Sequence, residues 1–117
     1  MKYCLEFLSN PDVVAINVDI LVAKRPLDFF YPDHKLHRQP RVVRDLFATH
    51  GVSGVHVYPY QIDVEKGTVF EWVKLVSALI TAIHENLDPD EPLIQTHPPR
   101  KIIFSGDGEY SYEEMVF

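Results

Sequence analysis

Residues 46–72 constrain the fold of this chain more than any other stretch of its sequence. These 27 residues hold the expected end of one helix, Gly51 as its left-handed cap, a β-hairpin around Pro59, and the start of a second helix. Glycine accepts the positive φ that commonly follows the last turn of a helix. Because the connections are so short, the elements must pack directly on one another, which predicts one small αβ unit.

The composition is typical of a single globular domain. The chain has 117 residues, of which 46% are apolar and 24% are charged, and this is enough for one modest core. We expect an αβ domain over residues 1–87 and a proline-rich, acidic C-terminal extension over residues 88–117. Residues 1–86 hold nine Lys/Arg and ten Asp/Glu, whereas residues 87–117 hold two and seven. Since no basic cluster is present, we expect no nucleic-acid partner.

The N-terminal residues and the cysteine usage predict a cytoplasmic protein. The single cysteine, Cys4, excludes an internal disulfide and a multi-cysteine metal site within one chain, and we expect it to be a small buried or semi-buried thiol. The first residues lack the continuous apolar segment of a signal peptide. No apolar run approaches the roughly 18–20 residues that span a bilayer, so no membrane contact is expected.

The periodicity of apolar residues predicts an α+β fold. Alternation indicates four strands, over residues 2–8, 14–22, 52–58 and 61–66. Helical spacing indicates two helices, over residues 40–50 and 68–87. The segment between the second strand and the first helix, residues 23–39, is expected to be an irregular loop. The predicted architecture is a two-layer sandwich in the order ββαββα, with a mainly antiparallel four-stranded sheet and both helices on one face.

The second predicted helix has the clearest signals. Thr68 and Glu71 fit a capping box, in which the threonine hydroxyl bonds forward and the glutamate reaches back. Its wide apolar stripe, which we expect to be buried against the sheet, consists of Val69, Trp72, Val73, Val76, Leu79, Ile80, Ile83 and Leu87.

A histidine pair is the candidate metal site. His34 and His37 are three residues apart, with Asp28 and Asp33 nearby. On a helix, two imidazoles at this spacing share a face and bind Zn²⁺ or Fe²⁺. The alternative is a solvated polar loop, because a structural zinc site needs three or four ligands and a further His or Asp would have to come from folding. A small iron- or zinc-binding protein that uses a histidine cluster is therefore the second functional hypothesis.

Five aromatic residues are the candidate partner-binding site, because clustered exposed aromatics mark protein interfaces. They are Phe29, Phe30, Tyr31, Tyr58 and Tyr60. The alternative is that the loop aromatics close the core. No nucleophilic triad, paired catalytic carboxylates or cofactor fingerprint is visible in the sequence. We therefore expect a protein that is not an enzyme and has no resident cofactor bound by a recognisable motif, iron at the histidines being the one exception.

Residues 3–86 resemble the N-terminal domain of Nfu/NifU-type iron–sulfur scaffold proteins. The positions that carry this resemblance are Asn10-Pro11, Leu46-Phe47, Gly51-Val52, Val55, Ile62, Val64, Lys66, Trp72, Leu75 and Ile83. In full-length members a separate C-terminal domain holds a Cys-x-x-Cys motif that binds the cluster, and this chain has no such motif. The resemblance therefore does not imply cluster binding by this chain.

The resemblance implies a stand-alone interaction module. Stand-alone N-terminal modules of this family are assumed to support protein interactions during iron–sulfur cluster assembly. We therefore expect a non-enzymatic accessory protein whose partners are components of that assembly. We expect the free sheet face or an edge strand to meet the partner, with the acidic tail steering the encounter. An uncovered sheet edge also allows pairing with a second copy of the chain, so a homodimer is a further expectation.

Overall fold

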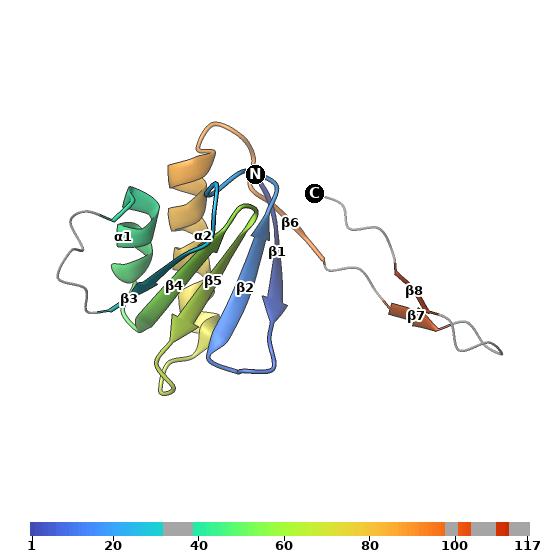
Figure 1. The fold of residues 1–117 in the computed structure, drawn as a ribbon, viewed down its shortest axis with the longest axis horizontal. Coiled ribbons are helices and arrows are strands. Elements are labelled where there is room, and N and C mark those ends of the chain that lie inside the picture. Colours follow the sequence, from blue (N-terminus) through green and yellow to red (C-terminus); the bar gives the residue numbers. More distant parts are fainter. Residues whose placement is uncertain (32–38, 98–100, 104–109, 113–117) are drawn as a thin grey trace.

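The computed structural model describes residues 1–31, 39–97, 101–103 and 110–112, and for the last two ranges only the backbone. Six strands form one sheet, in the order β3-β4-β5-β2-β1-β6, and two helices cover one of its faces (Figure 1). The strands are β1 (Lys2–Phe7), β2 (Val13–Val18), β3 (Leu27–Phe30), β4 (Val52–Tyr58), β5 (Gln61–Lys66) and β6 (Ile94–Thr96). The helices are α1 (Arg41–Phe47) and α2 (Trp72–Leu87). Two further strands, β7 (Lys101–Ile103) and β8 (Tyr110–Tyr112), pair with each other in a separate two-stranded sheet.

The predicted α+β class is confirmed, but the sheet has six strands and not the four predicted, and one of its strand pairs is parallel. The four predicted strands are present and lie side by side as β4-β5-β2-β1, each pair antiparallel. The sheet also gains β3, which pairs antiparallel with β4, and β6, which pairs parallel with β1. Both added strands are edges of four and three residues, too short for alternation to be visible in the sequence. Hydrogen bonds to a neighbouring strand make these segments extended.

The core lies between the sheet and the helices. Alternate residues of each central strand point to the helices, as the two-residue period of a strand requires. The largest side chains that are fully buried there are Val14, Ile16 and Val18 of β2, Val55 of β4, Ile62 and Val64 of β5, Val43 and Leu46 of α1, and Leu79 and Ile83 of α2. These residues belong to one continuous hydrophobic cluster. The two layers are therefore joined by one core, as the sequence predicted.

Helix α2 begins four residues later than predicted, and the predicted capping box is wrong. Its N-cap is Glu71, which makes no side-chain cap hydrogen bond, whereas the Thr68 hydroxyl donates to Oδ2 of Asp12 at 3.1 Å. Two residues of the predicted buried stripe are on the surface, Val69 being 87% and Val73 84% exposed. Within the described residues, no helix combines the length and hydropathy that crossing a membrane requires.

Gly51 adopts the predicted positive φ, 109°, but it does not cap the first helix. Helix α1 ends at Phe47, and Gly51 lies in the following turn, where the Val52 amide donates to the Thr49 carbonyl at 3.2 Å. A Cβ atom at this position would be 2.8 Å from the ring of Phe70. Glycine is therefore required here for its backbone conformation and for the close approach of the ring.

The chain that follows α2 returns to the N-terminus. The Met1 ammonium group lies 2.8 Å from a carboxylate oxygen of Asp88 and donates to the Pro92 carbonyl at 2.7 Å. The Ile94 amide donates to the Met1 carbonyl at 2.9 Å, and the register then aligns Ile94–Thr96 with Lys2–Cys4. Part of the predicted C-terminal extension thus belongs to the sheet.

Candidate partner-docking surfaces

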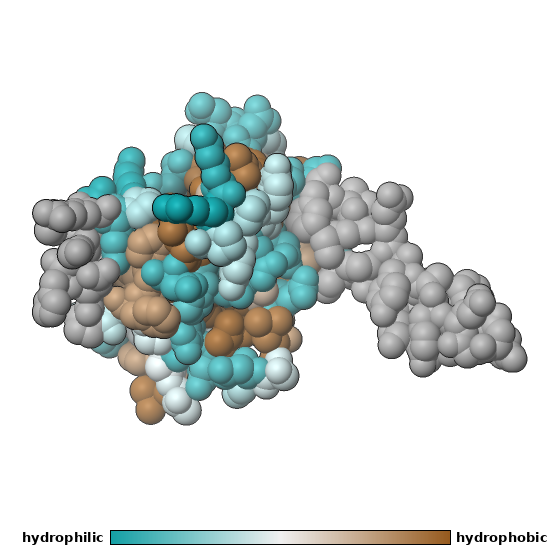
Figure 2. All heavy atoms as spheres, in the orientation of Figure 1, coloured by the Kyte–Doolittle hydropathy of each residue, from teal (hydrophilic) through white to brown (hydrophobic). Residues whose placement is uncertain are grey.

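The sheet face opposite the helices, here called the helix-free face, is the first candidate site. In the register, Glu6 lies beside Ala15 and then Asp63 across β1, β2 and β5, and Asp28 lies beside His56 on β3 and β4. Because side chains alternate along a strand, these residues point away from the buried Ile16 and Ile62. In Figure 1 the strands lie in front of α2, and Figure 2, in the same orientation, shows hydrophilic residues over much of this face.

Hydrogen bonds between polar side chains organise the helix-free face. The Asn17 amide donates to Oε1 of Glu6 at 2.7 Å, and the Gln61 amide donates to Oδ1 of Asp63 at 2.7 Å. These bonds hold two carboxylates at defined positions on β1 and β5, the two strands that flank β2. Carboxylates outnumber cations on this face, so it presents negative charge to a partner.

Among the described residues, His56 is the one basic side chain that forms ion pairs with carboxylates of this face. Its Nδ1 lies 2.8 Å from Asp28 Oδ1, and its Nε2 lies 3.4 Å from Glu65 Oε2. Burial by itself lowers the pKa of His56, but the hydrogen bonds and negative charges of Asp28 and Glu65 exceed this effect and raise it above its ordinary value of 6.5. Both ring nitrogens donate in the protonated form, which fits two carboxylate partners. His56 thus ties the edge strand β3 to β4 and β5.

We expect the folded protein to lose stability as the pH rises through the raised pKa of His56. The protonated ring is favoured in the folded state, so its contribution is complete below about pH 6.5 and disappears above the folded pKa. The change should be no more than about 1 kcal/mol, because Asp28 is 64% exposed and solvent screens the pair. Urea unfolding at pH 6 and pH 8.5 measures it, with His56→Gln as the variant that removes the dependence. A ¹H–¹⁵N titration that finds the pKa of His56 at or below 6.5 would contradict this expectation.

An apolar groove between β1 and α2 is the second candidate site. It has a volume of about 560 Å³, and its walls include Leu5, Phe7, Trp72, Val73, Val76 and Leu93. Several of these side chains are exposed, among them Phe7 at 62% and Val73 at 84%. The volume lies in the range of protein ligand sites. The helices leave this part of β1 uncovered, so apolar side chains that α2 and β1 would otherwise bury against each other remain in contact with solvent.

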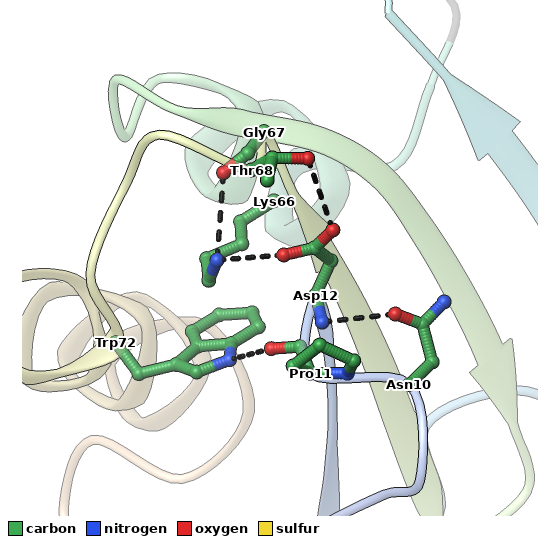
Figure 3. A network of polar contacts seen from close by, with 7 residues as sticks. All are labelled: Asn10, Pro11, Asp12, Lys66, Gly67, Thr68 and Trp72. Atoms are coloured by element: carbon green, nitrogen blue, oxygen red, sulfur yellow. Dashed lines mark hydrogen bonds and ion pairs between the residues drawn. The ribbon is translucent and has the colours of Figure 1, made fainter.

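A polar network between the first turn and the second hairpin positions one wall of the groove (Figure 3). The Lys66 ammonium group is 2.8 Å from Oδ1 of Asp12, and it lies 5.5 Å from the centre of the Trp72 ring. The indole Nε1 of Trp72 donates to the Pro11 carbonyl at 2.8 Å. The hydrogen bond from Lys66 is the main cause that lowers the pKa of Asp12. The network therefore fixes the start of α2 and with it the position of Trp72.

The polar network also explains four of the positions that carry the family resemblance. Asn10, Pro11, Lys66 and Trp72 come together at this one place, the Asp12 amide donating to Oδ1 of Asn10 at 3.0 Å. Lys66 is only 8% exposed, although it is charged. A buried ammonium group needs a carboxylate and further polar or aromatic partners. The structural contacts of these residues thus explain why they occur at these positions.

The structure divides the five predicted partner-binding aromatics between three places. Phe30 is 57% exposed and contacts the His56 ring edge-to-face at 5.3 Å, on the helix-free face. Phe29 packs against the core, and Tyr31 lies 6.2 Å from the Phe47 ring of α1. Tyr58 and Tyr60 line a hollow at the β4–β5 turn. The five residues do not form one cluster, and whether any of them binds a partner stays a prediction.

The predicted metal pair, His34 and His37, lies outside the described residues and stays a prediction. Within residues 1–31 and 39–97, no three side chains of His, Cys, Asp or Glu come together as a metal ion would need. Cys4 is fully buried, and burial together with the charge of Glu6 raises the pKa of its thiol. The expectation of a small buried thiol is confirmed.

Sequence reasoning expected a partner at the free sheet face or at an edge strand, but it named no residues of the helix-free face and did not predict the groove. The helix-free face did have a signal, since Asp63 and Glu65 alternate with buried Ile62 and Val64 along β5. The groove had none, because its walls come from β1, α2 and the segment before β6, which are far apart in the sequence.

Comparisons with known proteins support the fold and leave the family open. No protein-family model matches the sequence, and no curated protein matches it. The fold is similar to the crystal structure of protein SAV1430 from Staphylococcus aureus, with a TM-score of 0.60 and 16% identity, over 71% of this chain and 99% of that one. It is also similar to the solution structure of a NifU-like protein from Saccharomyces cerevisiae, with a TM-score of 0.60 and 10% identity, over 69% of this chain and 73% of that one. At these identities the likeness concerns the fold alone.

Proposed function

We propose that this protein is a non-enzymatic docking module that works with components of iron–sulfur cluster assembly. In this proposal it has no resident cofactor, and its helix-free face binds a basic surface on a partner protein. The observation that carries the proposal is the concentration of carboxylates on that face. Glu6 lies on β1, Asp63 and Glu65 lie on β5, and Asp28 lies on β3, with His56 of β4 as the cation beside Asp28 and Glu65.

Electrostatic complementarity supports a basic partner surface. Charges held at defined positions on a sheet face steer the encounter with an oppositely charged surface and disfavour partners of the same sign. The side-chain bonds of Asn17 to Glu6 and of Gln61 to Asp63 are already formed in the free protein, so little side-chain order has to be gained on binding. The cluster-assembly context is supported by the resemblance of residues 3–86 and by the fold likeness to the NifU-like protein.

Capture of purified assembly proteins by the immobilised chain tests this function. We expect a component to be retained, and retention should weaken as the salt concentration rises from about 0.05 to 0.3 M. Asp63→Lys should weaken binding roughly tenfold or more, because it places a like charge opposite the basic surface.

The matched control is Glu71→Lys, which makes the same change of charge at the start of α2, on the helix side of the molecule. Glu71 is 66% exposed, so the substitution should leave the fold and the retention unchanged. If no assembly component is retained above background, the cluster-assembly role is wrong. Equal weakening by both variants would instead show that overall charge, and not the helix-free face, governs binding.

A further inference from the structure

The outer edge of β1 is only half covered. Strand β6 pairs with Lys2–Cys4, and among the described residues no strand pairs with the outer side of Leu5–Phe7. Open backbone groups on a sheet edge are a template for an added strand. The apolar groove begins beside this same stretch, since Leu5 and Phe7 belong to its walls. A strand added here would therefore meet both backbone hydrogen-bonding groups and an apolar surface.

The alternation of β1 determines what such a strand must carry. Leu5 is in register with Ile16 and faces the helices, whereas Glu6 is in register with Ala15 and faces the helix-free side. Alternate side chains of an added strand would enter the groove, and the residue between them would lie beside Glu6. None of the described residues that line the groove is charged, so two large apolar residues fit there.

The charge of Glu6 selects the middle residue. Asn17 donates to Oε1 of Glu6, and within the described residues nothing is bonded to Oε2. A cross-strand neighbour of opposite charge is stabilising, whereas a like charge is destabilising. A second copy of this chain that paired through Leu5–Phe7 would place Glu6 against its equivalent, which disfavours a homodimer at this edge.

The geometry points to a binding site for an extended peptide segment of a partner protein, in which a lysine or arginine stands between two large apolar residues. The segment adds a strand beside Leu5–Phe7, its apolar side chains enter the groove toward Trp72 and Val73, and its basic side chain pairs with Glu6. This site shares Glu6 with the helix-free face, but its groove and its strand edge lie outside that face, and it does not depend on a role in cluster assembly.

Fluorescence anisotropy with two labelled heptapeptides tests the site, using the full chain. One peptide has Leu-Lys-Leu at its centre, the other has Leu-Glu-Leu, and both have Gly and Ser on either side. We expect the lysine peptide to bind roughly fivefold or more tightly than the glutamate peptide. Glu6→Lys should invert this preference, a result that loss of folding cannot produce.

Two exposed valines provide a matched pair of variants for the groove. Val73→Lys places a charge in the groove wall and should weaken binding of the lysine peptide roughly tenfold. Val69→Lys makes the same change at a residue that is equally exposed, 87% against 84%, and lies outside the groove. It should leave the affinity unchanged.

Four outcomes would overturn the site. Equal affinity for the two peptides, or equal weakening by Val69→Lys and Val73→Lys, would contradict it directly. A dimer in light scattering that Val73→Lys dissociates would assign the groove to a second copy. Much tighter peptide binding by a chain ending at His97 would assign the groove to the chain's own tail. Failure of the capture experiment with assembly proteins would leave the peptide preference, and therefore this site, unaffected.

Discussion

Leu79→Ala is expected to lower the free energy of unfolding by about 2–5 kcal/mol. Leu79 is fully buried on the inner side of α2 and belongs to the cluster that joins the helices to the sheet. The substitution removes apolar surface from the core and leaves a cavity that the surrounding side chains fill only in part. Urea unfolding followed by circular dichroism measures the change, and the slope of the transition should stay constant.

Val73→Ala is the control for this prediction. Val73 lies on the same helix and in the same predicted apolar stripe, yet it is 84% exposed. Truncation of this side chain to alanine should change the free energy of unfolding by less than about 0.5 kcal/mol. Equal effects of Leu79→Ala and Val73→Ala would contradict the observed orientation of α2 on the sheet.

Gly51→Ala is expected to destabilise the protein by about 2–5 kcal/mol, for two reasons that add. First, the backbone of Gly51 has φ of 109°, a conformation that residues with a Cβ rarely adopt. Second, the new methyl group would lie 2.8 Å from the Phe70 ring, which also contacts the His50 ring edge-to-face at 5.1 Å. The ring cannot move without losing packing beside α2. Chemical denaturation of the purified variant measures the loss.

A second set of measurements, made in a Phe70→Ala chain, separates the effect of the backbone conformation from the effect of the steric conflict. In a Phe70→Ala chain the steric conflict is absent, so Gly51→Ala should then destabilise by only the backbone part, about 1–3 kcal/mol. A substitution that is neutral in both backgrounds would show that the turn before β4 does not hold Gly51 at positive φ.

The sequence predicted the central sheet and the two helices because their residues repeat with a clear period. Along β5, Ile62 and Val64 alternate with Asp63 and Glu65, and this pattern alone indicates which side is buried. The same reasoning failed at the edges. Segments as short as β3 and β6 show no period, and they become strands only because β4 and β1 offer backbone partners.

The start of α2 shows the same limit of local sequence patterns, here at a single residue, Thr68. Thr68 and Glu71 have the spacing of a capping box, but Asp12, 56 residues earlier in the chain, accepts the Thr68 hydroxyl. A local signal was overridden by a partner that only folding brings close. The candidate metal residues His34 and His37 lie outside the described residues, so that prediction is unchanged by the structure.

Composition and periodicity by themselves determined an α+β domain, its four central strands, its two helices and the positive φ of Gly51, since each of these depends on residues that are close in sequence. Only the tertiary structure shows which strands form the edges of the sheet and which residues form the two docking surfaces. Among the described residues, the edge at Leu5–Phe7 has no strand partner because β6 stops at Thr96, and the groove exists because α2 leaves Val73 in solvent beside β1. Such features depend on where segments that are far apart in the sequence end relative to one another in space. No local pattern of residues encodes these relative positions.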